Sequence, residues 1–231
     1  MKFKKERKAV FISHLDLMRT FQRAIRRAKL PIVYSGGFNP RPEMSFGQAL
    51  GLGIESIGEY LDIIIYNDMD LFAIKDNLNN NLPDGIEVID IALLKEKAKS
   101  AMSIVSHCKY LLNFRLNFKD IGGIEIIKNG FGGFINQTNI YIDKEQVKKK
   151  KVVSVDIKPM IKQIELSLID KDLQIECIVS CGSAANLKPE LIIKAFEDYL
   201  GINISDYKIK KIELFTEEDN DLIPLIAVDT I

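Results

Sequence analysis

The sequence predicts an α+β fold of two tandem ferredoxin-like domains, each a β-α-β-β-α-β unit with an antiparallel sheet. Its length of 231 residues suits two small domains that each bury a core. The first 95 residues carry strand and helix patterns in that order, and the second half repeats the plan more weakly. We therefore expect domains at residues 1–97 and 98–231, joined by the charged stretch 95–102.

The first half begins with a short strand within residues 1–11 and continues with a helix that starts at Ser13. Ser13 is a good N-cap, and Asp16 lies three residues later, where its charge suits the helix dipole. On a helical wheel the apolar residues occupy one arc and three arginines align opposite them, namely Arg19, Arg23 and Arg26. Pro31 ends this helix. The sequence thus predicts a helix with one core face and one basic face.

The rest of the first half completes the predicted unit. Residues 44–50 and 59–66 predict two strands, the latter with alternating faces. A second helix begins at a capping aspartate within residues 68–83, and residues 85–94 predict the fourth strand. The order of these elements is that of a ferredoxin-like sandwich.

The second half follows the same plan less clearly. We expect strands or extended segments at 105–118, 135–143, 152–161 and 207–215, a short helix at 121–130, and a hairpin at 163–181 that turns at 170–172. Residues 188–201 predict a helix with Pro189 in its first turn and Gly201 as its stop. The end of the chain, residues 216–228, fits a frayed tail and a docking strand equally well.

Charge along the chain points to an anionic partner. The net charge is zero, yet residues 1–50 hold 11 Lys and Arg against 3 acids, and residues 51–100 hold 4 against 10. This asymmetry favours a basic face for nucleic acid, although the two segments can also pair with each other. No apolar run approaches the ~20 residues needed to cross a membrane, and the N-terminus is unlike a signal peptide. We expect a cytoplasmic protein.

The three cysteines suggest buried, reduced thiols. Cys108, Cys177 and Cys181 are odd in number and lie in apolar surroundings. Cys177 and Cys181 match the first half of a Cys-x3-Cys-x2-Cys iron–sulfur motif, but the third position is Ala184. Two thiolates cannot replace the three that such a cluster needs. We therefore expect no metal site and no cofactor.

The loop "IVYSGGFNPRPEMSFG" (residues 32–47) is the best candidate for a binding site. Arginine engages phosphates in a bidentate manner, and exposed aromatic rings stack on unpaired bases. The predicted anion- or RNA-binding residues are Arg19, Arg23, Arg26, Arg41, Asn39, Tyr34 and Phe38. The residues predicted to shape the loop are His14, Asp16, Ser35, Gly37, Pro40 and Pro42. The alternatives are a solvated helix face and aromatic residues buried in the core.

His14 has three open interpretations. It can pack against the core and pin the loop through a hydrogen bond, contact a ligand directly, or act as a general base. A histidine at a helix N-terminus tends to be neutral, because the dipole disfavours its cation. His107 begins a strand and is expected to be structural.

Residues 11–63 resemble the signature block of the radical SAM-linked proteins, a bacterial family built on a domain of unknown function. The resemblance rests on "SHLDLMR" (13–19) and "YSGGFNPRP" (34–42), and continues more loosely at 155–159 and 182–190. Lys158 and Lys188 stand where the family more often has arginine, which puts bidentate anion contacts there in doubt.

The resemblance implies a partner. Members of this family occur beside or fused to a radical SAM (S-adenosylmethionine) protein, often one with a cobalamin-binding module, in a context of RNA or ribosome maturation. We therefore expect a non-catalytic RNA-binding or substrate-presenting partner of a radical SAM enzyme in tRNA or rRNA modification. DNA and membranes are not expected partners. The alternatives are a metal-independent endoribonuclease using His14 and a protein-interaction module that docks on the enzyme.

Overall fold

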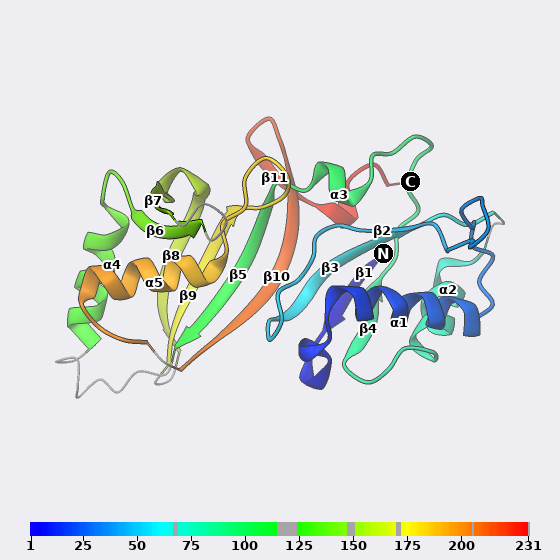
Figure 1. Cartoon of the computed structure of the whole chain (residues 1–231), viewed down its shortest axis with the longest axis horizontal. Helices are drawn as coiled ribbons and strands as arrows, with labels where there is room; N and C mark the ends of the chain where they lie inside the picture. Colours follow the sequence, from blue (N-terminus) through cyan, green and yellow to red (C-terminus); the bar gives the residue numbers. More distant parts are fainter. Residues whose placement is uncertain (67–68, 115–123, 147–150, 170–171, 205, 231) are drawn as a thin grey trace. The chain divides into compact units, whose positions relative to one another are not determined.

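The computed structural model describes residues 1–231 except 67–68, 115–123, 147–150, 170–171, 205 and 231 (Figure 1). The fold is α+β with mostly antiparallel strand pairing, which confirms the predicted class. The chain forms two compact units: unit 1 contains residues 1–107 and 210–231, and unit 2 contains residues 108–209. Unit 2 is thus an insertion within the chain of unit 1. From the sequence we expected the boundary between the domains after residue 97. That prediction did not include the return of the chain to unit 1 at residue 210.

Unit 1 holds the elements expected for the first half together with the end of the chain. They are β1 (Lys2–Lys5), the 3-10 helix η1 (Arg7–Phe11), α1 (His14–Arg27), β2 (Met44–Phe46), β3 (Glu55–Ile63), α2 (Leu71–Asn79), β4 (Ile86–Asp90), α3 (Ala101–Ile104), β10 (Tyr207–Glu218), β11 (Asp221–Pro224) and the 3-10 helix η4 (Leu225–Ala227). The strands run in the order β4-β1-β3, all antiparallel. β2 pairs antiparallel with the end of β3, and β10 pairs parallel with its start.

The core of unit 1 lies between this sheet and the two longer helices. Phe21 of α1 packs edge-on against Phe3 of β1, with ring centroids 4.9 Å apart, and Phe46 of β2 joins both rings. Leu78 of α2 and Leu61 of β3 are fully buried in the same cluster. Because Phe46 ends the loop that follows α1, this cluster fixes both the helix and the end of the loop.

Local signals start the two helices as expected. The Ser13 hydroxyl oxygen accepts the Asp16 N–H at 3.1 Å, and the Asp70 carboxylate accepts the Ala73 N–H at 3.1 Å. Capping side chains of this kind satisfy backbone donors that have no partner within the helix. α1 ends at Arg27, where Lys29 turns left-handed with φ of 50° before Pro31.

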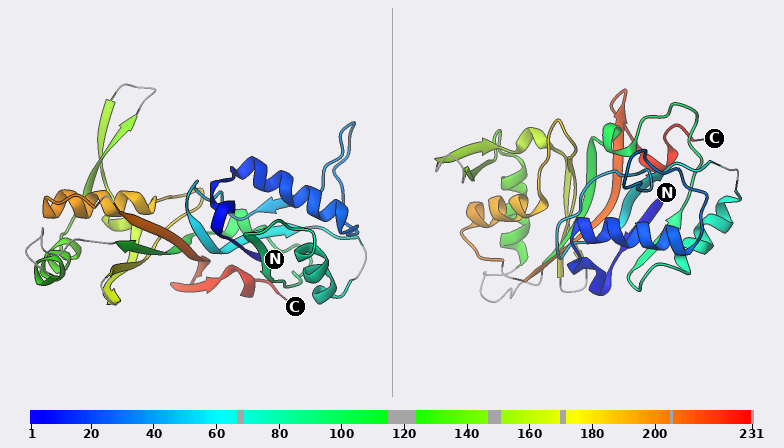
Figure 2. Two further views of the ribbon diagram at one scale, coloured as in Figure 1. Left: turned by 90° about the horizontal axis from the view of Figure 1, so that it is seen from below. Right: turned by 45° about the vertical axis from the view of Figure 1, so that its right-hand side comes forward.

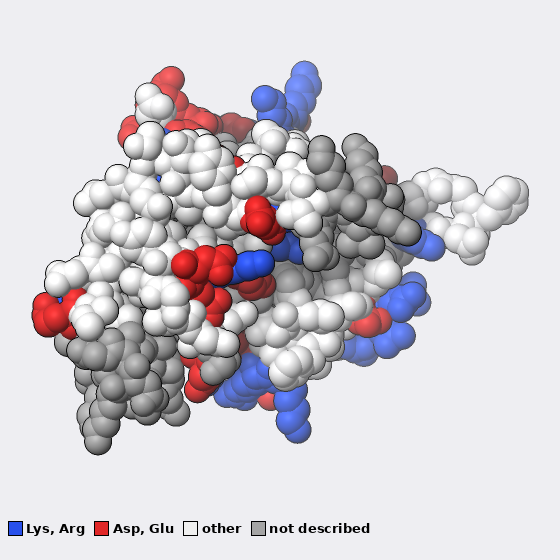
Figure 3. Space-filling model, turned by 60° about the vertical axis from the view of Figure 1, so that its left-hand side comes forward, with Lys and Arg blue, Asp and Glu red and all other residues white. Residues whose placement is uncertain are grey.

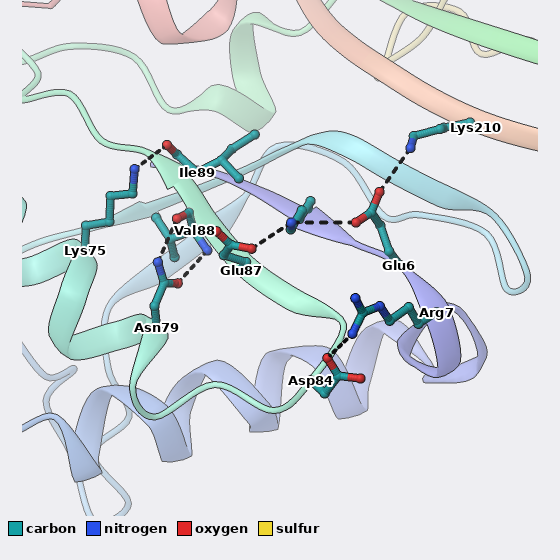
Figure 4. A network of polar contacts seen from close by, with 10 residues as sticks. Glu6, Arg7, Lys75, Asn79, Asp84, Glu87, Val88, Ile89 and Lys210 are labelled. Atoms are coloured by element: carbon teal, nitrogen blue, oxygen red, sulfur yellow. Dashed lines mark hydrogen bonds and ion pairs between the residues drawn. The ribbon is translucent and has the colours of Figure 1, made fainter.

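Side chains from distant parts of unit 1 tie β10 to the N-terminal strands. Lys210 lies 3.0 Å from Glu6, within the polar network of Figure 4. The same network joins Arg7 to Asp84 at 2.7 Å. A glycine makes the strand pairing possible, because a Cβ on Gly58 would collide with the Ile212 carbonyl.

The end of the chain is a docking strand, which settles the open alternative for residues 216–228. β11 forms an antiparallel hairpin with β10, and the turn residues Asp219 and Asn220 both have positive φ, 51° and 71°. Leu225 and Val228 are buried beyond it. The tail is therefore part of the fold of unit 1.

Unit 2 contains two α-helices, one 3-10 helix and five strands among its described residues. The elements are β5 (His107–Phe114), α4 (Ile124–Ile135), β6 (Tyr141–Gln146), β7 (Lys151–Asp156), the 3-10 helix η3 (Lys158–Met160), β8 (Ile161–Ile169), β9 (Asp172–Ser180) and α5 (Pro189–Leu200). β9 lies between β5 and β8, and β6 and β7 form a separate hairpin. Residues 170–171 of the predicted turn lie outside the described residues.

The helices of unit 2 pack through aromatic rings. Phe131 of α4 meets Phe196 of α5 edge-on, with ring centroids 5.5 Å apart, and Phe134 lies beside both. α5 begins with Pro189 and ends at Gly201 in a left-handed conformation, as expected. No helix of the described chain is both long enough and apolar enough to span a bilayer.

Candidate nucleic-acid interface

The loop after α1 is a narrow hairpin, which we call the projecting hairpin (residues 33–43). Its two sides are joined by backbone hydrogen bonds from Ser35 N–H to the Arg41 carbonyl and from Glu43 N–H to the Val33 carbonyl, both 2.8 Å. The Ser35 hydroxyl also accepts the Arg41 N–H at 3.1 Å. Gly37, at the tip, has φ of 103°, which only glycine adopts without strain. The hairpin is therefore braced at its sides and turned by glycine.

The tip of the projecting hairpin presents an aromatic ring to solvent. The Phe38 side chain is fully exposed to solvent, and Tyr34 is 41% exposed. Asn39 and Pro40 are also exposed, whereas Pro42 is buried at the base. In the left view of Figure 2 the blue segment after α1 extends away from the helices. Of three further aromatic residues of unit 1, Tyr66 is exposed, and Phe46 and Tyr60 are buried.

The basic face of α1 is exposed beside this hairpin. Arg19, Arg23 and Arg26 all point to solvent, opposite the buried Phe21 and Ile25. Arg19 is paired with Asp16 at 3.2 Å. Arg23, Arg26 and Arg41 form no ion pair within the described part of the chain. Figure 3 shows basic side chains gathered at the base of an uncharged projection. Two helix arginines and one hairpin arginine thus have side chains available for an anion.

The His14 ring packs against the aromatic cluster of unit 1 and is only partly exposed to solvent. The ring lies edge-on to Phe46 with centroids 5.2 Å apart. The nearby Asp16 carboxylate accepts the Ser13 hydroxyl at 2.7 Å and an Arg19 N–H at 3.2 Å. The Ser13 bond, followed by Arg19 and Arg23, holds the pKa of Asp16 below its usual value. The Asp16 carboxylate is thus engaged at the start of α1, where it holds the hydroxyl of the capping residue Ser13.

The second-half motifs have structural partners. The Asp156 carboxylate accepts N–H groups of Asn139, Ile140 and Lys158 at 2.7, 2.9 and 3.0 Å. The Lys158 ammonium donates to the Ile135 carbonyl at the end of α4. Lys188 is exposed as the residue before α5. The Lys158 side chain is therefore engaged in joining α4 to the β6-β7 hairpin.

The cysteines lie in apolar surroundings. Cys108, Cys177 and Cys181 are free thiols and at most 3% exposed. Burial raises the pKa of Cys177 to about 12. In the part of the chain that the structure describes, no group of three or more His, Cys, Asp or Glu side chains is placed to hold a metal ion.

Two exposed apolar side chains beside α1 were not expected from the sequence. Phe11 at the end of η1 is 75% exposed, and Leu15 in the first turn of α1 is 58% exposed. The sequence places Phe11 at the end of a segment that holds a strand. It places Leu15 in a helix without assigning it to the core face or the basic face. The only local signal was that Leu15 falls off the apolar arc shared by Leu17 and Phe21.

Comparison with known families places the chain. Residues 1–189 match the model of a family described as "Uncharacterized protein conserved in bacteria (DUF2344)". The chain belongs to this family. The DUF2344 match includes α1, the projecting hairpin and β3, and it ends at the first residue of α5.

Other comparisons add little about the activity of this DUF2344 member. No curated protein matches the sequence. Among solved structures, one chain of "Crystal Structure of a Cbf5-Nop10-Gar1 Complex" has a TM-score of 0.43 and 12% sequence identity. The alignment covers 96% of this chain and 50% of that chain. This chain thus spans about half the length of the matched one, and a likeness of this size establishes neither a shared fold nor a shared activity.

Proposed function

We propose that this DUF2344 protein binds RNA through α1 and the projecting hairpin, as a non-catalytic partner of a radical SAM enzyme in RNA modification or ribosome maturation. The observation that supports RNA binding is the combination of Arg23, Arg26 and Arg41 with a fully exposed Phe38 on a braced hairpin. The radical SAM partner is proposed from the resemblance of residues 11–63 alone.

The two kinds of side chain suit RNA for separate reasons. Arginines without an internal partner gain charge-assisted hydrogen bonds to phosphates and release counterions. An exposed ring stacks on a base that is unpaired, at ~1–3 kcal/mol per base. The hairpin bonds limit the entropy lost when Phe38 is immobilised. Loops and single strands are therefore better substrates than a continuous duplex.

We also propose that each unit follows the ferredoxin-like plan. In unit 1 the order β4-β1-β3, with β2 on the end of β3, supports this assignment. In unit 2 the chain order is β5, α4, β8, β9, α5 once the β6-β7 hairpin is set aside as an insertion. Sheets with one open face are a common platform for RNA recognition, but this is an analogy of fold and not of site.

The arginines are tested by the salt dependence of RNA binding. The protein is titrated with a fluorescent oligouridine between about 50 and 200 mM salt. Arg23→Gln/Arg26→Gln should weaken binding and lower the slope of log K against log salt by roughly 1.4, or about 0.7 per lost phosphate contact. Lys194→Gln/Lys208→Gln removes the same charge from exposed positions on α5 and at the start of β10 and is the control. Equal effects of the two double variants would contradict this interface.

The hairpin is tested separately from the charge. Phe38→Ala should reduce affinity for the unpaired oligonucleotide by about 1–3 kcal/mol and leave the salt slope unchanged. Phe72→Ala, which removes a ring that is 74% exposed on α2, is the matched control. If Phe38→Ala binds RNA as the wild type does, the hairpin has no part in stacking.

The two alternatives make different predictions. The endoribonuclease alternative requires His14, so RNA cleavage that survives His14→Ala removes it. The packing of His14 on Phe46 gives no observation in its favour. The protein-interaction alternative predicts that the radical SAM enzyme co-purifies after nuclease treatment. Our proposal predicts an association that weakens when RNA is digested.

A further inference from the structure

Unit 1 contains a cavity of about 720 Å³ that has no role in the proposed RNA interface. It lies where β3 and β4 end and α2 begins. Two segments form one side of it and leave it partly open to solvent: residues 91–104 and 225–230, which we call the cover segments. They lie side by side (Figure 1), joined by the Lys95 N–H to the Asp229 carbonyl at 2.8 Å. The Ala101 N–H further ties the first cover segment to Asp62 of β3 at 2.7 Å.

The wall of this cavity is aliphatic. Its side chains include Ile63, Ile65, Leu71, Ile74, Ile104 and Leu225. They come from β3, the start of α2 and both cover segments. A volume of this size lies within the ~300–1,000 Å³ usual for small-molecule sites, which are lined mainly by apolar side chains. The wall therefore favours the transfer of a hydrocarbon from water.

Two polar side chains of the wall, Tyr60 and Asp62, already have partners. The Tyr60 hydroxyl donates to Glu213 at 2.7 Å and accepts the Ile226 N–H. Burial and the neighbouring Glu213 raise the pKa of Tyr60, so the phenol stays neutral. Asp62 is held by the Ala101 N–H. A charged group placed against these side chains would lose its hydration without gaining a partner.

The charged side chains of the wall do not favour an ion of either sign. Glu43, Asp62 and Asp229 share the wall with Lys95, Lys97, Lys99 and the Met1 amino group, which already donates to the Leu61 carbonyl at 2.9 Å. All three lysines are exposed, so their attraction for a charged head group is screened. Ile64 and Leu93, also in the wall, are 53% and 47% exposed. The cavity thus reaches the surface through apolar side chains.

We propose that this cavity binds an uncharged, predominantly aliphatic small molecule, such as an acyl or isoprenoid chain with a neutral head. Its entry passes Ile64 and Leu93, between the cover segments and the end of β3. The residues proposed to contact RNA, namely the arginines of α1, Arg41 and Phe38, are absent from its wall, although Glu43 at the base of the projecting hairpin belongs to it.

The test compares three ligands of equal chain length by isothermal titration calorimetry on the full chain: decanol, decanoate and decylammonium. Decanol should bind at one site per chain, with a negative heat-capacity change that reports apolar burial. Decanoate and decylammonium should each bind with an affinity at least about tenfold lower than that of decanol. Equal affinity of all three, tighter binding of either ion, or no binding of decanol up to its solubility limit would overturn the proposal.

Two variants locate the site. Ile104→Trp fills the cavity from the first cover segment and should weaken decanol binding about tenfold or more. Met102→Trp adds the same ring on the same short helix, at a side chain that is 57% exposed and outside the wall, and should bind as the wild type does. If Ile104→Trp loses its native circular dichroism spectrum, Ile63→Phe serves instead. Unchanged decanol binding by a folded filling variant would refute this location.

Discussion

The Glu59 carboxylate on β3 lies 2.9 Å from the Lys211 ammonium on β10, and neither side chain is more than 2% exposed. Lys5 of β1 is buried beside them, and its ammonium donates to the Ile12 carbonyl at 2.9 Å. Burial lowers the pKa of Lys5, Glu59 raises it, and Lys211 lowers it further. These three buried charges join the first, third and tenth strands of the fold.

Removing Lys211 should destabilise the protein strongly. Lys211→Met leaves the Glu59 carboxylate buried without its closest cation, and breaking one side of a buried pair costs about 3–5 kcal/mol. Urea unfolding measures the change, and Lys208→Met, at an exposed position of the same strand, is the control. A loss below about 1 kcal/mol would show that the burial of Glu59 does not depend on Lys211.

Gly58 should not tolerate a side chain. A Cβ there would collide with the Ile212 carbonyl oxygen and lie 2.7 Å from the Glu213 Cα, so Gly58→Ala forces β3 and β10 apart. Overpacking of this kind costs about 1–3 kcal/mol. Gly132→Ala on α4 has no atom within 4 Å of the new Cβ and should stabilise the helix by about 0.5–1 kcal/mol. The thermal midpoints of the two variants should therefore move in opposite directions.

Asp156 should contribute to stability in a defined pH range. Its pKa is below the ordinary value of 3.8, chiefly because of the Asn139 amide and then the Ile140 and Lys158 N–H groups. A carboxyl whose folded pKa is lowered stabilises the fold above its unfolded pKa, and this stabilisation is lost as pH falls through the folded value.

Urea midpoints between neutral pH and pH 3 test this expectation. Asp156→Asn should lower the midpoint at neutral pH and reduce its loss below about pH 4. Asp143→Asn, an exposed position on the same hairpin, should follow the wild type. Parallel curves for all three proteins would show that Asp156 is not coupled to folding.

The cysteines should be inert in the native protein. With a pKa of about 12, the Cys177 thiol has only about one molecule in ten thousand as thiolate at pH 8. Cys108 and Cys181 are equally inaccessible. A thiol reagent should therefore react with none of the three before unfolding and with all three in urea. Rapid reaction of one thiol in the native state would show that its surroundings open locally.

The parts of the fold that the sequence predicted depend on local signals. Ser13 and Asp70 cap their helices through contacts within three residues, and Gly201 ends α5 through its own φ. The basic face of α1 follows from helical spacing in the same way. The residues of the candidate interface were therefore named from the sequence, whereas their partners, such as Asp16 for Arg19, came from the structure.

The parts that the sequence did not predict depend on distant pairings. Lys211 pairs with Ser56 in a parallel register across 155 residues of chain, and nothing near either residue signals it. Lys5 and Glu59 carry charged side chains of kinds that are seldom fully buried, yet both are buried. The cavity was missed for the same reason, because its wall combines β3, α2 and the end of the chain.

The insertion of unit 2 within the chain of unit 1 bears on synthesis at the ribosome. Residues 1–107 emerge first, but the strand that carries Lys211 emerges only after the whole of unit 2. Domains made in one continuous piece can fold as they appear. Here Glu59 and the edge of β3 must wait for the last segment, so unit 2 is expected to fold during translation before unit 1 is complete. Unit 1 is thus begun before unit 2 and completed after it.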